Sequence, residues 1–114
     1  MKDFMFFFRG PSDLKLTPEQ SQVQVQQWMA WIHKLSAEGR FSGGGPLSPT
    51  GKVVKGTKPV ITDGPFTEGK EMMGGYILIK AASLEEATEI SFGYPDYDKG
   101  CSLEVRELLQ PPTR

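Results

Sequence analysis

The chain has 114 residues, of which 38% are hydrophobic and 24% charged, a balance typical of one globular domain with its own core. Its formal net charge of −1 gives no general attraction for nucleic acid or an anionic membrane, so we expect neither as a partner. The single cysteine, Cys101, excludes an internal disulfide. With only one cysteine and one histidine the chain offers few metal ligands, so we expect no metal or other cofactor.

The first predicted element is a strand over residues 4–8. All five residues are apolar and are followed by Arg9-Gly10-Pro11, which favours a strand over a helix. Because the run does not alternate with polar residues, we expect both faces of this strand to be covered. The run is too short for a signal peptide, and no apolar run is long enough to cross a membrane, so we expect a cytoplasmic protein. From its length we expect a single domain over residues 1–114.

A helix is predicted over residues 18–38. Thr17 and Gln20 form a capping box at its start, and Gly39 ends it. His33 lies about 120° from the centre of the predicted apolar stripe, so we expect it to face solvent. The stripe consists of Val25, Trp28, Ile32 and Leu35, bordered by Met29 and Trp31.

Glycine and proline dominate residues 41–51, which are predicted to form a loop. Residues 52–55 and 59–61 are predicted to be short pieces of an edge strand, because Pro59 cannot donate a hydrogen bond within a central strand. Residues 62–66 are predicted to form a turn.

A second strand without alternation is predicted over residues 75–80. Ser83 and Glu86 then predict a capping box, and Gly93 and Pro95 end the helix that it opens. A last, half-exposed strand is predicted where apolar and polar residues alternate, with Cys101, Leu103 and Val105 on its inner side.

The element order β-α-β-β-α-β indicates the α+β class and a ferredoxin-like fold. We expect a four-stranded antiparallel sheet with two helices on one face. The first and third strands are apolar throughout and are therefore expected at the centre of the sheet. Since two helices cover one face only, we expect a symmetric homodimer through the open sheet face. The alternative is that the long central loop folds back over that face.

Residues 62–76 carry the most specific motif, Thr62-Asp63-Gly64-Pro65-Phe66-Thr67-Glu68-Gly69-Lys70-Glu71 followed by Gly74-Gly75-Tyr76. It resembles the signature of YCII-related proteins with a DGPF motif. Weaker matches extend over nearly the whole chain, at Trp28, Gly39, Leu47, Ala87, Pro95 and Glu104-Val105-Arg106. The resemblance implies a ferredoxin-like fold, dimers of the dimeric α+β barrel kind and a bacterial source. It also implies a link to transcription, since some members are associated with sigma factors.

Some members of the family carry a His/Asp pair proposed as catalytic. Trp28 and Ala37 stand at those positions here, so the resemblance does not bring that chemistry with it.

Asp63 is the central candidate for a functional site. In one interpretation its carboxylate accepts backbone hydrogen bonds in a turn. In the other, Asp63, Lys70 and Arg106 bind a ligand, and Asp63 and Glu71 are the candidates for proton transfer. The first functional hypothesis is therefore a small-molecule-binding protein or enzyme with a pocket next to the DGPF turn. The alternative is a non-catalytic dimeric interaction or regulatory module linked to transcription.

Overall fold

The computed structural model of the chain describes residues 1–11, 15–48, 50–58, 60–64 and 71–109. Neither helix in this part of the chain is long and apolar enough to cross a membrane. The elements in chain order are β1 (Lys2–Pro11), α1 (Pro18–Ala37), β2 (Phe41–Pro46), β3 (Gly51–Lys55), β4 (Val60–Gly64), β5 (Glu71–Ala81), α2 (Leu84–Ser91), the 3₁₀ turn η1 (Tyr97–Lys99) and β6 (Ser102–Glu107).

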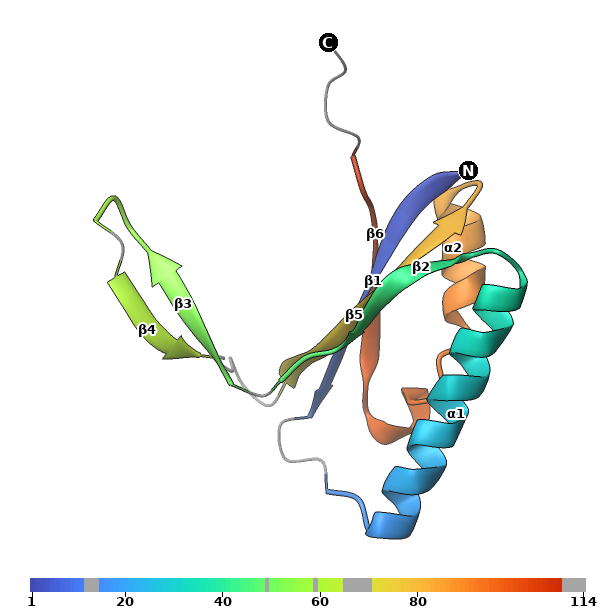
Figure 1. Cartoon of the computed structure of the whole chain (residues 1–114), viewed down its shortest axis with the longest axis horizontal. Coiled ribbons are helices and arrows are strands. Elements are labelled where there is room, and N and C mark those ends of the chain that lie inside the picture. The colour runs from blue at the N-terminus through green and yellow to red at the C-terminus, as the bar shows by residue number, and fades with distance from the viewer. Residues whose placement is uncertain (12–14, 49, 59, 65–70, 110–114) are drawn as a thin grey trace.

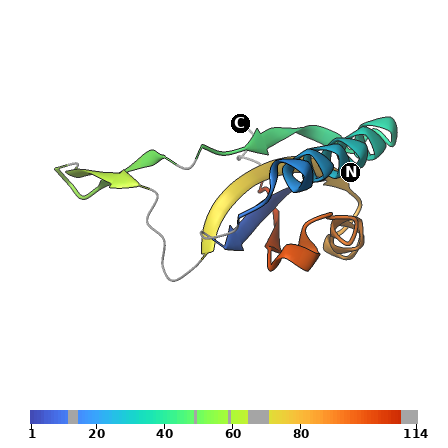
Figure 2. The same cartoon turned by 90° about the horizontal axis from the view of Figure 1, so that it is seen from below.

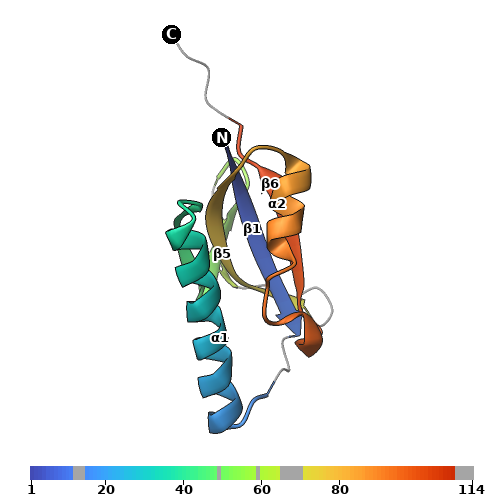
Figure 3. The ribbon, with the colours of Figure 1, turned by 90° about the vertical axis from the view of Figure 1, so that its right-hand side faces the viewer.

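Four strands form an antiparallel sheet in the order β2-β5-β1-β6. Both helices lie on the same face of this sheet (Figures 1 and 3). The two strands with continuous apolar runs, β1 and β5, occupy the centre as predicted. The expected α+β, ferredoxin-like arrangement is therefore confirmed.

The edge strand next to β5 differs from the one predicted. It is β2, which lies in the segment expected to be a loop, whereas residues 52–55 and 60–64 pair with each other in a separate two-stranded sheet. Gly44 explains the difference: its φ is +103°, and a Cβ placed there would lie 2.4 Å from the Tyr76 carbonyl oxygen. Glycine here permits a close approach between strands, which composition alone does not distinguish from loop flexibility.

We refer to the two-stranded sheet β3–β4 as the arm. Among the described residues, its strands pair only with each other. The arm projects from the main sheet on the side away from the helices and stands apart from the rest of the chain (Figures 1 and 2). The described part of the central segment therefore does not fold back over the open sheet face.

Burial alternates along the central strands, although their sequences do not. Phe4, Phe6 and Phe8 are buried beneath the helices, whereas Met5 and Phe7 are half-buried on the open face. The same alternation on β5 buries Ile77 and Ile79 and leaves Tyr76 and Leu78 on the open face. The described part of the chain thus covers only one of the two faces that the sequence predicted to be covered.

Helix α1 begins with the predicted capping box and is followed by Gly39 with a φ of 73°. Its buried stripe is centred on Trp31 and Leu35, while Val25 is 58% exposed. The prediction of Val25 in the core was wrong, because the larger ring of Trp31 takes the central place and stacks on Phe6 at 6.2 Å. His33 is exposed, as expected.

Helix α2 has only half of its predicted capping box. The Ser83 hydroxyl accepts a hydrogen bond from the Glu86 backbone N–H, as expected. The Glu86 carboxylate does not return a bond to Ser83 but accepts from the Ala82 N–H and from Arg40. This side chain therefore links α2 to the segment that follows α1.

Candidate functional site

A groove with a volume of about 340 Å³ lies between α1 and α2, on the helix side of the sheet. Figure 3 shows the two helices on the same face of the sheet. Residues of both helices, and of the segments that follow them, line the groove. Apolar side chains of the two helices face it together with charged ones. Its lining residues are Trp31, Lys34, Leu35, Glu38, Arg40, Glu86, Glu89, Ile90 and Gly93.

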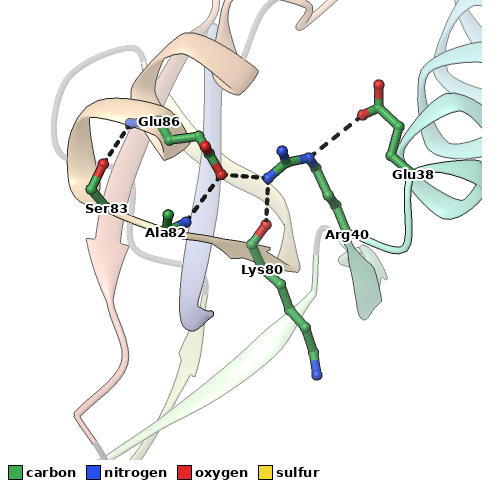
Figure 4. A network of polar contacts seen from close by, with 6 residues as sticks. All are labelled: Glu38, Arg40, Lys80, Ala82, Ser83 and Glu86. Atoms are coloured by element: carbon green, nitrogen blue, oxygen red, sulfur yellow. Dashed lines mark hydrogen bonds and ion pairs between the residues drawn. The ribbon is translucent and has the colours of Figure 1, made fainter.

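Arg40 lines the groove and is held by a network of polar contacts (Figure 4). Its Nη1 donates to Glu86 Oε1 at 2.6 Å and to the Lys80 carbonyl oxygen at 3.2 Å, and its Nε lies 3.7 Å from Glu38. The hydrogen bonds from Arg40 and from the Ala82 N–H hold the pKa of Glu86 below its ordinary value. The charge of Arg40 is thus matched by carboxylates, and its side chain is fixed in place.

Three other groups lining the groove remain available to a ligand. Lys34 and Glu89 are exposed and form no ion pair within the described residues. Trp31 Nε1 lies so close to Gly93 that a Cβ on Gly93 would come within 2.7 Å of it, and the described part of the chain offers this N–H no acceptor. The groove therefore presents a cation, an anion and a hydrogen-bond donor beside the apolar side chains of Leu35 and Ile90.

A second polar cluster surrounds Asp96, which is 3% exposed. Asp96 Oδ2 accepts hydrogen bonds from Trp28 Nε1 at 2.7 Å and from Gln24 Nε2 at 3.0 Å. Lys99 Nζ lies 3.3 Å from Oδ1, which accepts no hydrogen bond in the described part of the chain. The cluster ties α1 to the segment between α2 and β6.

Two other titratable groups near Asp96, the Tyr94 phenol and the Cys101 thiol, are kept neutral. Burial raises the pKa of the Tyr94 phenol far above its usual range and also raises the pKa of the Cys101 thiol. Because the thiolate is the reactive form of cysteine, Cys101 is a weak nucleophile at neutral pH. This cluster therefore has the character of a structural tether.

The residues predicted from sequence are placed on separate elements. Asp63 belongs to β4 in the arm, Glu71 begins β5, and Arg106 lies on β6 at the far edge of the main sheet. Arg106 is 70% exposed and donates to Glu104 at 3.2 Å. Lys70 and the Pro65-Phe66 half of the DGPF turn lie outside the described residues. Within one chain, β4 and β6 are not neighbours, so the structure does not bring Asp63 and Arg106 together.

The groove was missed at the level of sequence because its charges come from distant segments. Arg40 is the lining residue that a local sequence signal could have indicated, because it directly follows Gly39, the glycine predicted to end the helix. In the structure Gly39 has a φ of 73°. No group of three or more His, Cys, Asp or Glu side chains suited to a metal ion occurs in the part of the chain that the structure describes.

Comparisons with known proteins agree with this fold. Residues 5–109 match the family profile of the YCII-related domain. Among solved structures, the chain is similar to a 5-chloro-2-hydroxyhydroquinone dehydrochlorinase from Burkholderia phenoliruptrix in complex with 2,5-dihydroxybenzoquinone. The TM-score is 0.50 at 19% identity, over 96% of this chain and 95% of that chain, a likeness that shows a shared fold. No curated protein matches the chain.

Proposed function

The chain belongs to the YCII-related family, and from this premise we propose that it is a small-molecule-binding protein whose ligand occupies the groove between α1 and α2. The groove's volume of about 340 Å³ carries this proposal, since it falls within the range of small-molecule sites. The dehydrochlorinase of similar fold, solved with a small cyclic compound, supports a ligand of modest size.

The chemistry of the groove favours a compact molecule with polar groups at its margin. A carbonyl, hydroxyl or carboxylate oxygen of the ligand accepts hydrogen bonds from Lys34 and Trp31 Nε1, while its apolar body lies against Leu35 and Ile90. Arg40 contributes shape more than charge, because Glu86 and Glu38 already satisfy it.

An enzymatic role would depend on Glu89. It is the carboxylate of the groove that forms no ion pair among the described residues, and a carboxylate beside a bound ligand is suited to proton transfer. The pocket next to the DGPF turn, with Asp63, Lys70, Glu71 and Arg106, stays the second candidate location for a ligand.

We also propose that the protein is a homodimer through the open sheet face. Two rows of paired residues cross this face: Gly43, Leu78, Met5 and Arg106 in one, and Gly45, Tyr76, Phe7 and Glu104 in the other. Apolar residues lie at the centre, and charges of both signs lie along β6, so the face is complementary to a second copy of itself.

A thermal-shift screen against small metabolites tests the location of the ligand. A compound that raises the melting temperature of the wild type is expected to lose most of its effect on Lys34→Met and on Glu89→Gln. It should keep its effect on the control Lys15→Met, because Lys15 precedes α1 and does not line the groove.

Loss of the shift in Asp63→Asn, with full retention in both groove variants, would move the site to the DGPF turn. A screen without any hit would favour the non-catalytic interaction or regulatory module linked to transcription.

A further inference from the structure

The arm does not line the proposed binding groove, so the proposed function does not explain it. Within the part of the chain that the structure describes, its two strands form no ladder with the main sheet. An isolated two-stranded hairpin is marginally stable in water. Val54 on β3 is 61% exposed, and Lys55 and Lys58 are exposed as well. A hairpin with an exposed apolar residue and little support from its own chain needs a surface to pack on.

The position of the arm indicates which surface that is. It projects on the side of the main sheet away from both helices, next to the open face that carries Met5, Phe7, Tyr76 and Leu78 (Figures 1 and 2). A second copy packed against the open face therefore lies beside the arm. Charge supports the same partner: residues 50–58 and 60–64 hold three lysines and one aspartate, whereas the whole chain has a net charge of −1.

We propose that the arm packs on the partner subunit of the homodimer, so that each subunit clasps the other. The proposal rests on the dimer through the open sheet face. It gives the segment that leads into the DGPF turn, which includes Asp63 on β4, a position between the two subunits.

Hydrogen–deuterium exchange of the arm at several protein concentrations tests this. The backbone amides of residues 50–64 are expected to be protected at concentrations where the wild type is a dimer. On dilution into the monomer, these amides should exchange at least tenfold faster, while those of β1 and β5 change little. Sedimentation of the same samples reports the oligomeric state independently.

A pair of matched valine substitutions provides the second measurement. Val54→Glu in the arm is expected to weaken dimerisation at least tenfold, because it places a charge in the contact. Val25→Glu on α1 starts from a similar exposure, 58% against 61%, and should change the dissociation constant by less than twofold. Circular dichroism of both variants checks that the fold is kept.

The outcomes separate the two proposals. A dimer whose arm exchanges equally fast at all concentrations, or whose affinity is unaffected by Val54→Glu, would overturn the clasp and leave the dimer standing. An arm protected equally in the monomer would show that it packs on its own subunit, which also overturns the clasp. A wild type that stays monomeric would overturn both.

Discussion

At the level of single residues, we expect the contact between Arg40 and Glu86 to make the junction of α1, β2 and α2 sensitive to acid. The carboxylate of Glu86 joins three segments through Arg40, the Ala82 N–H and the helix that carries it. Its pKa is lowered from 4.5 by the hydrogen bonds from Arg40 and Ala82. A group with a lowered pKa in the folded state stabilises the fold above its ordinary pKa and loses that contribution as the pH falls through the folded value.

The lowered pKa of Glu86 gives the first prediction. Glu86→Gln should lower the melting temperature most at neutral pH, and the difference from the wild type should vanish as the pH falls below 4.5. Thermal melts between pH 7 and about pH 3 measure this. The control Glu85→Gln lies one residue earlier, outside the Arg40 network, and should not follow this profile. A difference for Glu86→Gln that is independent of pH would contradict the assigned role.

Gly44 gives the second prediction. Gly44→Ala places a Cβ 2.4 Å from the Tyr76 carbonyl oxygen in a backbone with a φ of +103°. The edge strand must move or strain, and we expect a loss of about 2–3 kcal/mol in the free energy of unfolding, measured with urea. Gly74→Ala on β5 is the control, since its Cβ would make only an ordinary contact at 3.8 Å. Equal effects of the two substitutions would show that β2 does not approach β5 as closely as described.

At the level of the elements, Asp96 holds α1 against the segment before β6. Asp96→Ala removes the acceptor of Trp28 Nε1 and Gln24 Nε2 and leaves Lys99 without its buried partner. We expect a loss of about 3 kcal/mol in the free energy of unfolding. Asp98→Ala is the matched control, because Asp98 is 81% exposed and its loss should cost no more than about 0.5 kcal/mol. Equal free energies of unfolding for the two alanine variants would show that the Asp96 contacts do not stabilise the fold.

The elements also show which features the sequence could predict. Caps and long apolar runs are local signals, so α1, β1 and β5 were predicted together with the central place of both strands. Trp31 rather than Val25 lies in the core because its ring packs against Phe6, which is a tertiary contact. The role of Gly44 depends on Tyr76, on a strand far along the chain. Neither contact can be predicted from local sequence. The groove could not be predicted, because Lys34 and Glu89 meet only through the packing of two helices on one sheet.

At the level of the whole molecule, the open sheet face decides the oligomeric state. Leu78 is half-buried at the centre of this face, opposite Met5 on β1 and Gly43 on β2. In the proposed homodimer Leu78 lies between the two sheets, where a charge would be desolvated without a partner. The wild type should therefore sediment at micromolar concentration with about twice the chain mass of 12.6 kDa.

Leu78→Arg is expected to sediment as a monomer, with its circular dichroism spectrum retained because the helix-side core is untouched. Met29→Arg is the control: Met29 is 52% exposed on α1, on the opposite side of the sheet, and the variant should remain a dimer. Dissociation by both substitutions would point to a general loss of stability rather than to an interface. Dissociation by Met29→Arg alone would place the interface on the helices, and the open face would then need a different partner.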